Sequence, residues 1–247
     1  MNFSVHRFET VSSTNDVAAR LAAEGASEGT VVVAGRQSAG RGRLGRSWVS
    51  SPGDGLYLSV ILRPPVPLEH VWQIGFVASL ATAEAIRRVS GIPARIKWPN
   101  DILVGGKKLA GILIESPSVT HADIGRAVII GIGINVNTSS FPPELGDRGT
   151  SILLQKDPAS RIEMSLVQDA LLDMLDIRYG QYGVEGFPPI LDSWKALDCT
   201  VGMVITALMS DGSVTGIAAG IDTDGNLIAQ CDNGSLVSIN AGEVLMR

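Results

Sequence analysis

Residues 97–115, KWPNDILVGGKKLAGILIE, have the pattern of two short strands joined by a tight turn. The pair Gly105-Gly106 forms the turn, because glycine supplies the positive φ angles that a two-residue hairpin loop requires. With this turn, Leu103 is expected to lie opposite Lys108. The stretch therefore predicts two antiparallel strands that follow each other with no helix between them.

The same hairpin is expected to bring charged side chains together. Period-two alternation places Asp101 on the face that carries Lys108, and a regular strand would also place Lys97 there, although Pro99 can break that register. Two lysines near one aspartate could form an anion pocket with an internal counter-ion. An exposed hairpin crossed by ordinary salt bridges is the alternative, which the hairpin taken alone favours.

Around this hairpin, strand and helix patterns follow one another without a steady β-α-β alternation. This order favours an α+β fold, with a mixed β-sheet and flanking helices, over a doubly wound parallel sheet. Strands are expected at residues 3–8, 30–34, 56–62, 95–98, 102–104, 107–115 and 124–136.

Helices are expected in three places. The first starts at Ser13, which forms a capping box with Asp16, and ends at Gly25. A long amphipathic helix starts at Leu68. The third opens at Asp157-Pro158, with the aspartate as N-cap and the proline in the first position. Its expected buried side consists of Ile162, Leu166, Leu171 and Leu175.

From about Leu197 the chain consists of short β-rich runs. They are separated by Asp211-Gly212, Asp224-Gly225 and Asn233-Gly234, and such dipeptides favour tight hairpin turns. We therefore predict two domains, a larger one at residues 1–196 and a small β-barrel at residues 197–247.

Composition limits the classes of function. The chain has 247 residues, and its 20 Lys and Arg against 25 Asp and Glu give a net charge of −5, which disfavours duplex nucleic acid as a partner. Its two cysteines, Cys199 and Cys231, have no CxxC spacing, which suits a reducing compartment. No secretory signal or membrane span is recognisable, so a cytoplasmic location is expected.

A long aperiodic segment at residues 35–55 contains GRGRLGR, residues 40–46. The string satisfies GxGxxG, but a dinucleotide-binding fingerprint must open a helix, and SWVSSPG follows here. Glycines that let an anion approach the backbone, together with guanidinium groups that fork onto it, indicate a phosphate-binding loop. A flexible surface loop or an RNA-binding arginine–glycine segment stays open as the alternative.

Residues 128–137, VIIGIGINVN, predict a strand with one apolar face. The other face carries Gly131, Gly133, Asn135 and Asn137, so a ligand could lie close to the backbone there and meet amide groups. Two glycines on that face argue against a half-exposed edge strand. Other catalytic patterns are missing: the histidines are scattered, zinc spacing is absent, and the sequence has neither GxSxG nor GxxxxGK[ST].

Taken together, these motifs resemble the biotin protein ligase family. The resemblance rests on Ser13-Thr14-Asn15, Gln37, residues 40–48, residues 97–101, residues 108–115 and residues 131–135 in that order. It implies a catalytic domain of the biotinyl/lipoyl protein ligase type and an SH3-like carboxy-terminal domain. It also implies ATP- and Mg²⁺-dependent formation of biotinyl-5′-AMP, followed by transfer of biotin to one lysine on the carrier domain of a biotin-dependent carboxylase.

The resemblance also implies roles for individual residues. Hydroxyl and amide groups at the start of the first helix would bind the biotin ureido ring, the arginine loop would fold over biotin and the phosphate, Lys108 would meet the biotin carboxyl group, and Trp48 would offer its face to adenine. The catalytic residues would be Arg43 and Lys108, to which we add Asp101 as a hypothesis from the chemistry of the second step. The biotin-binding residues would be Ser13, Thr14, Asn15, Gln37, Arg41, Gly42, Arg43, Lys108 and Gly111. The ATP-binding residues would be Arg46, Trp48, Asn100, Gly133 and Asn135, with the metal ligands unassigned.

Further expectations concern the second reaction step, DNA binding and the alternative functions. We expect Asp101 to orient or deprotonate the acceptor lysine. The Ser-Thr-Asn motif at position 13 leaves no room for a preceding helix-turn-helix domain, so we expect a monofunctional ligase that does not bind operator DNA; a homodimer is an open option. The alternatives are a lipoate or octanoate ligase, which the polar Ser13, Thr14 and Gln37 disfavour, and a non-enzymatic biotin or nucleotide sensor.

Overall fold

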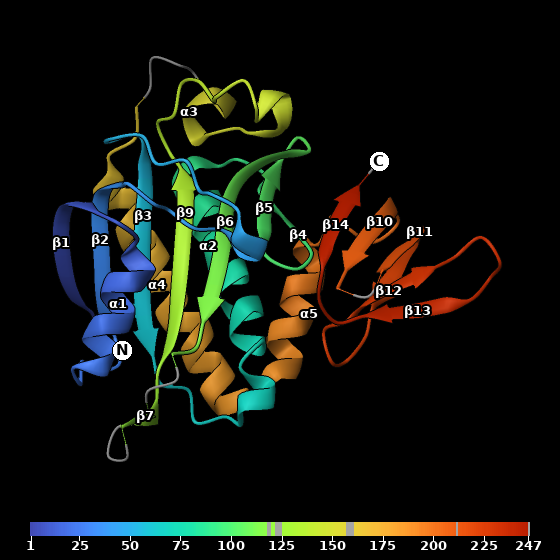
Figure 1. Ribbon diagram of the computed structural model, residues 1–247, viewed down its shortest axis with the longest axis horizontal. Coiled ribbons are helices and arrows are strands. Elements are labelled where there is room, and N and C mark those ends of the chain that lie inside the picture. The colour runs from blue at the N-terminus through green and yellow to red at the C-terminus, as the bar shows by residue number, and fades with distance from the viewer. Residues whose placement is uncertain (118–119, 122–124, 157–160, 211, 247) are drawn as a thin grey trace.

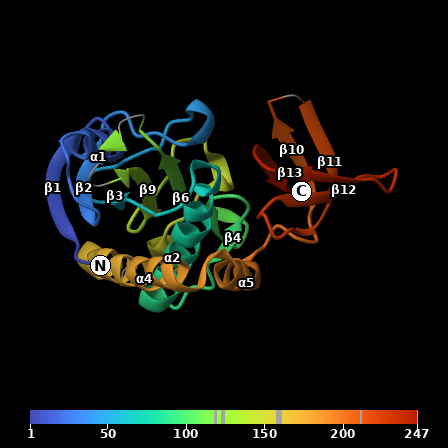
Figure 2. The same ribbon diagram turned by 90° about the horizontal axis from the view of Figure 1, so that it is seen from below.

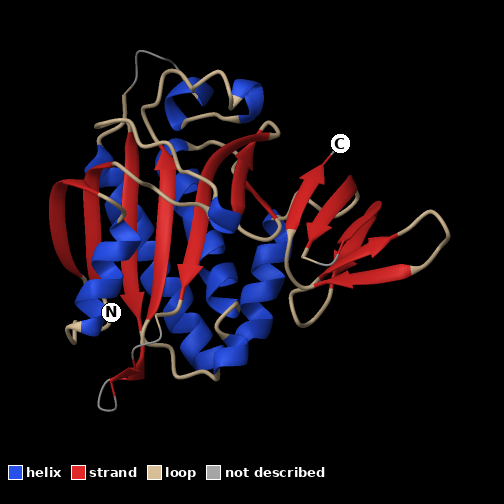
Figure 3. Ribbon diagram, viewed as in Figure 1, coloured by secondary structure: helices blue, strands red, loops and turns tan. Residues whose placement is uncertain are grey.

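The computed structural model describes residues 1–117, 120–121, 125–156, 161–210 and 212–246. They form a large mixed-sheet body and a smaller all-strand unit beside it (Figures 1 and 3). The elements of the body are β1 (Ser4–Val11), α1 (Thr14–Ala23), β2 (Thr30–Gln37), η1 (Arg43–Gly45), β3 (Gly55–Leu62), η2 (Leu68–His70), α2 (Gln73–Ser90), β4 (Arg95–Lys97), β5 (Asp101–Val104), β6 (Lys107–Glu115), β7 (Thr120–His121), β8 (Gly125–Arg126), β9 (Val128–Asn135), η3 (Gly146–Arg148), α3 (Ile152–Gln155), α4 (Met164–Glu185) and α5 (Phe187–Leu197).

The body contains a seven-stranded sheet in the order β1-β2-β3-β9-β6-β5-β4. Strands β1 and β2 are parallel, and every other neighbouring pair is antiparallel. The sheet is therefore mixed, as the sequence predicted. Strand β9 lies between β3 and β6 in the middle of the sheet, so its glycine-bearing face is not that of an edge strand.

Helices cover both faces of the sheet unequally. Helices α2, α4 and α5 pack on one face and α1 on the other, as the view along the sheet shows (Figure 2). The larger core lies on the α2 side and includes the buried Leu58, Leu80 and Trp194. The smaller core joins Ala18 of α1 to Ile61 and neighbouring residues. The opening beside α1 thus leaves part of that sheet face free for a binding site.

The hairpin at residues 97–115 forms as predicted. Gly105 and Gly106 have φ angles of 56° and 77°, and Leu103 pairs with Lys108. The register shifts between Ile102 and Leu103, so a β-bulge interrupts the ladder there.

Two predictions about helix starts are wrong. Helix α1 follows an extended Ser13, but the Ser13 side chain makes no capping hydrogen bond; the carboxylate of Asp16 contacts Arg41 instead, so no capping box forms. Leu68 belongs to the short η2 turn and is 56% exposed, whereas α2 begins at Gln73.

The last helices of the body also differ from the prediction. The proposed start at Asp157-Pro158 lies outside the described residues, and α4 begins at Met164. Leu171 and Leu175 are buried, but Leu166 is 56% exposed because the neighbouring Val167 takes the inward position. Helix α5, which has Pro188 in its first turn, was not predicted.

The carboxy-terminal unit is a five-stranded antiparallel sheet in the order β13-β12-β11-β10-β14. Gly225 and Gly234 occupy predicted turns with φ angles of 72° and 81°; Asp211 lies outside the described residues. The strands are β10 (Val204–Met209), β11 (Gly212–Ile221), β12 (Leu227–Gln230), β13 (Leu236–Ile239) and β14 (Glu243–Met246).

A tight seam joins this unit to the body. The indole N–H of Trp98 donates a hydrogen bond of 2.9 Å to the carbonyl oxygen of Gly225. A Cβ atom on Gly225 would lie 2.6 Å from Cζ3 of Trp72, so only glycine fits this aromatic socket.

Within the described ranges, no helix combines the length and hydropathy that a membrane crossing requires.

Candidate functional site

A cavity of about 440 Å³ opens between the sheet, the arginine loop and strand β14. Its volume is in the range of pockets that bind small molecules. It brings together residues that are far apart in the sequence. Each predicted site residue lines it: Ser13, Thr14, Asn15, Gln37, Arg41, Gly42, Arg43, Arg46, Trp48, Asn100, Asp101, Lys108, Gly111, Gly133 and Asn135.

One end of the cavity is a connected polar cluster at the start of α1. The backbone N–H and hydroxyl of Thr14 both donate to Oε1 of Gln37, at 2.8 and 3.1 Å. Beneath them, the hydroxyl of Ser59 lies 2.7 Å from Oγ1 of Thr14 and 2.6 Å from Oδ1 of Asn15. Ser59 is fully buried and was not predicted, although a lone serine in the apolar run 56–62 was a signal. The cluster presents fixed hydrogen-bonding groups to the cavity.

The glycine face of β9 is covered by side chains of the protein itself. Asn15 packs directly on Gly131, and Trp48 packs on Gly133 and Gly111, where added Cβ atoms would lie 2.5 and 3.0 Å from the indole. The predicted close approach to the backbone therefore occurs, but the groups that make it are protein side chains.

Trp48 connects this face to the charged end of the cavity. Nζ of Lys108 lies 5.5 Å from the indole centroid, which is a cation–π distance. The indole Nε1 is buried and has no hydrogen-bond partner among the described residues. A buried unpaired N–H group costs about 1–3 kcal/mol, and the packing of the indole on Gly133 and Gly111 carries this cost.

The charged end holds the predicted pair of lysines around Asp101. Nζ of Lys108 lies 2.5 Å from Oδ1 of Asp101, and Nζ of Lys97 lies 3.9 Å from Oδ2. Burial lowers the pKa of Lys97, and attraction to Asp101 partly opposes that change. The hairpin is thus a charged wall of the cavity and not an exposed hairpin.

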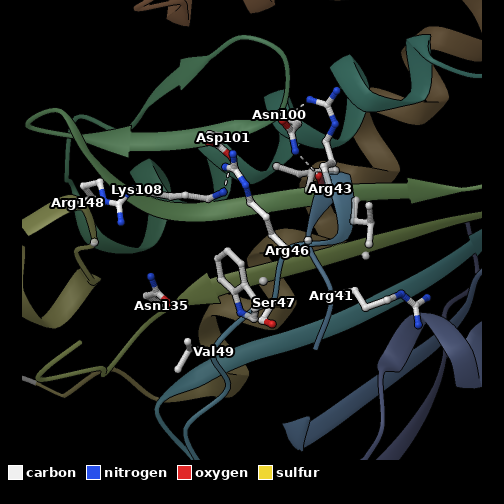
Figure 4. A pocket seen from close by; sticks show the side chains of 18 of the residues that line it. Arg41, Arg43, Arg46, Ser47, Val49, Asn100, Asp101, Lys108, Asn135 and Arg148 are labelled. Carbon is white, nitrogen blue, oxygen red and sulfur yellow. Dashed lines mark hydrogen bonds and ion pairs between the residues drawn. The ribbon is translucent and has the colours of Figure 1, made fainter. Parts of the chain in front are cut away.

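The arginine loop is held against the rest of the protein. Arg43 donates to Oδ1 of Asn100 at 2.9 Å (Figure 4). Arg41 pairs with Asp16 and Glu115, and Arg46 pairs with Glu243. The pKa of Arg43 is lowered by burial. The three guanidinium groups therefore contact protein acceptors in this structure.

Glycine is required at the start of this loop. A Cβ atom on Gly40 would lie 2.7 Å from the carbonyl oxygen of Trp48, to whose N–H group Gly40 is hydrogen-bonded at 2.8 Å. At the loop tip, Leu44 adopts a φ of 55° and is 68% exposed. This left-handed conformation is costly for leucine and indicates a constrained tip.

Three further polar residues also line the cavity. Asn100 donates to the carbonyl of Ile112 at 2.6 Å, and Asn135 donates to the carbonyl of Thr150 at 3.0 Å. Arg148 lies beside Lys108 at the cavity rim (Figure 4). It was not predicted, because residues 138–149 show no periodic pattern that would place them.

A metal site made by the protein alone is not present in the described part of the chain, where no three His, Cys, Asp or Glu residues cluster. Mg²⁺ commonly needs only one or two carboxylates besides substrate phosphates and water. The carboxylates that line the cavity among the described residues are Asp101, which has two ammonium groups as neighbours, and Glu243, which is paired with Arg46. The site therefore suits a Mg²⁺ ion held mainly by a bound nucleotide.

Two family models match the chain in succession. Residues 7–135 match the biotin/lipoate A/B protein ligase family, and residues 202–247 match the biotin protein ligase C-terminal domain. The matched ranges correspond to most of the sheet body and to the five-stranded unit.

Individual relatives agree with these models. The bifunctional ligase/repressor BirA of Bacillus subtilis is 41% identical over 228 residues, which cover 92% of this chain and 69% of that protein. The biotin--[acetyl-CoA-carboxylase] ligase of Paracoccus denitrificans is 36% identical over 242 residues, covering 94% of this chain and 96% of that protein. Among solved structures, biotin protein ligase from Aquifex aeolicus in complex with biotin and ATP has a TM-score of 0.86 at 29% identity, covering 99% of this chain and 98% of that one.

Proposed function

The chain belongs to the biotin protein ligase family, and on this premise we propose how its cavity divides the work of the reaction. The enzyme activates biotin with ATP to biotinyl-5′-AMP and transfers biotin to a specific lysine of a biotin carboxyl carrier domain. The observation that carries the proposal is that one cavity collects the hydroxyl–amide cluster, the arginine loop and the lysine–aspartate group.

Biotin is proposed to lie with its ureido ring at the polar cluster and its carboxylate at Lys108. Ser13, Thr14, Asn15 and Gln37 offer both donors and acceptors, which a ureido group needs, whereas an aliphatic lipoyl or octanoyl chain offers no partner for them. Gly111 leaves room beside Lys108, and Arg41, Gly42 and Arg43 border the opening. This polarity is the reason to favour biotin over lipoate or octanoate.

ATP is proposed to lie between Trp48 and the arginine loop. The indole offers its face to adenine, and Gly133 allows the ring to pack closely on β9. Asn100 and Asn135 line the same region, and Arg46 and Arg43 can leave their protein partners for phosphate oxygens. Mg²⁺ would neutralise phosphate charge when bound.

In the first step, a carboxylate oxygen of biotin bonds to the α-phosphorus of ATP, and the bond to pyrophosphate breaks. Two anions must meet, so cations placed beforehand lower the barrier by position and by electrostatic stabilisation. Lys108 and Arg43 are the proposed cations. No protein nucleophile is required.

In the second step, the amine of the acceptor lysine bonds to the biotinyl carbonyl carbon, and AMP leaves. The lysine must lose a proton, for which Asp101 is the proposed acceptor or orienting group. Oδ1 of Asp101 lies 2.5 Å from Nζ of Lys108, which supports the proposal that both steps take place in the same part of the cavity.

The remaining parts of the proposal concern organisation. We infer a boundary between residues 196 and 197, a biotin-dependent carboxylase as the source of the carrier domain, and a cytoplasmic location, which the free cysteines Cys199 and Cys231 support. A homodimer is a further option, because β1 is an exposed strand at the sheet edge. Sedimentation at several concentrations would test it.

The decisive assay measures biotin-dependent exchange of pyrophosphate into ATP in the presence of Mg²⁺. We expect exchange with biotin and none above background with lipoate or octanoate. A purified carrier domain should then accept biotin on one lysine. Exchange that depends on lipoate or octanoate, or binding of biotin without exchange, would replace the proposal by one of the alternatives.

A further inference from the structure

Glu115, the last residue of β6, lies outside the cavity but touches two of its walls. Oε2 of Glu115 accepts a hydrogen bond of 2.7 Å from Nδ2 of Asn15, which belongs to the polar cluster. The same carboxylate accepts two hydrogen bonds from Nη2 of Arg41, at 2.9 and 3.1 Å. Because Glu115 is absent from the cavity lining, it does not reach a ligand itself.

This carboxylate fixes which way the Asn15 amide faces. Ser59 donates to Oδ1, and Glu115, which as a carboxylate can only accept, takes the amide N–H. Asn15 is 3% exposed, and its Oδ1 packs on Gly131, so a flipped amide would leave buried groups unpaired. The orientation of Asn15 thus depends on Glu115.

The arginine loop depends on the same carboxylate and on a second one. Arg41 is bound by Glu115 and by Asp16, but among the described interactions the Asp16 carboxylate makes no hydrogen bond with the side chain of Asn15. Asp16 is also absent from the cavity lining. Among the described residues, the Glu115 carboxylate joins the loop to the polar cluster, whereas the Asp16 carboxylate holds the loop without a hydrogen bond to that cluster.

We propose that Glu115 is a positioning residue that couples the biotin subsite to closure of the arginine loop. Biotin that orders Asn15 also holds Glu115 in place, and Glu115 then holds Arg41. Loop closure in turn strengthens biotin binding by the same factor, since such coupling is reciprocal. The inference rests on the proposed binding of biotin at Ser13 to Asn15.

The test compares trypsin cleavage after the loop arginines with and without saturating biotin. Biotin should slow cleavage of the unmodified enzyme about tenfold, a typical size for coupling between two sites. In Glu115→Gln the amide offers one acceptor oxygen where two donors compete, so protection should fall to about twofold or less. The KM for biotin in pyrophosphate exchange should rise about five- to tenfold with kcat nearly unchanged, because Glu115 touches no reacting atom.

Asp16→Asn is the matched control. It also loosens Arg41, so cleavage without biotin should rise, but the protection factor should stay near that of the unmodified enzyme and the KM for biotin should change less than about twofold. A merely destabilising effect of either substitution would appear in the thermal midpoint and not as a loss of biotin protection.

Two outcomes distinguish a wrong biotin subsite from a wrong role of Glu115. If Asn15→Ala leaves the KM for biotin unchanged, the proposed biotin subsite is wrong, and the coupling through it falls with it. If Asn15→Ala raises that KM while Glu115→Gln keeps both the KM and the full protection, the subsite stands and the coupling role of Glu115 is overturned.

Discussion

At the scale of single residues, Trp48 packs so closely on Gly133 that adding one methyl group at position 133 should impair ATP binding. A Cβ atom there would lie 2.5 Å from Cε2 of the indole, so Gly133→Ala must displace the ring. We expect the KM for ATP to rise about tenfold or more, because the proposed adenine platform is lost. Pyrophosphate exchange at varied ATP measures it. An unchanged KM would show that ATP does not use Trp48.

Asp101 allows the two steps of the reaction to be separated. Asp101→Asn keeps the shape of the side chain but removes the proton acceptor beside Lys108. We expect transfer from preformed biotinyl-AMP to a carrier domain to slow about a hundredfold, within the usual range for a general base. The defect should shrink as the pH rises and more of the acceptor lysine is neutral. Transfer at the normal rate across this pH range would remove Asp101 from the second step.

At the scale of elements, two glycines of similar surroundings predict opposite effects. Gly180 lies inside α4, and Gly91 caps α2 with a φ of 71°; a Cβ atom on either would meet no atom within 4 Å. Gly180→Ala should stabilise the fold by about 0.5–1 kcal/mol, because alanine favours the helix. Gly91→Ala should destabilise it by about 1 kcal/mol, because alanine disfavours the left-handed cap. Urea unfolding of both variants would contradict this argument if the two shifts had the same sign.

Most strands and turns could be predicted from the sequence, because turn propensity and hydrophobic alternation depend on neighbouring residues. The glycine pair at residues 105–106 identified its two strands correctly, and the turn dipeptides identified the carboxy-terminal unit. The single strand expected at residues 124–136 is correct only for β9, because Gly125 and Arg126 belong to the separate strand β8 and residue 124 lies outside the described residues. Helix α5 was missed because its prolines, which fit a first helical turn, also resemble a loop. Pairing between distant strands, such as β3 with β9, depends on tertiary packing that no local pattern records.

For the candidate site, too, local patterns predicted part of the structure and tertiary contacts determined the rest. Residue types and spacing identified groups that line one cavity, including Lys97 and Lys108 around Asp101. The contacts between distant segments were not foreseeable: Ser59 beneath Thr14, Glu115 between Asn15 and Arg41, and Glu243 at Arg46. Each joins residues that are distant in sequence, so spacing along the chain carries no signal of them.

At the scale of the whole molecule, all three tyrosines are predicted to resist ionisation. Burial raises the pKa of Tyr57 to about 12, and burial also raises the pKa of Tyr179 and of Tyr182. Since the unfolded value is about 10, the folded state retains these protons, and the stability they contribute is fully present below pH 10 and is lost as the pH rises through the folded values.

We therefore expect absorbance at 295 nm to stay flat near pH 10 and to rise only in the pH range where ellipticity at 222 nm reports unfolding. The same protein in concentrated guanidinium chloride should titrate near its ordinary value of about 10, which is the control. A tyrosine that ionises near pH 10 in the folded enzyme would contradict the burial described for it.

The aromatic socket around Gly225 has a consequence for recombination between relatives. The turn of the carboxy-terminal unit fits against Trp72 and Phe76, and its carbonyl accepts the indole proton of Trp98. A chimaera that exchanges only residues 197–247 would keep Trp72, Phe76 and Trp98 of this chain but take the turn that packs against them from a relative. Such chimaeras should remain active when positions 72, 76 and 98 come from the same relative as the turn. The segment that can be exchanged is therefore defined by these contacts and not by a single boundary in the sequence.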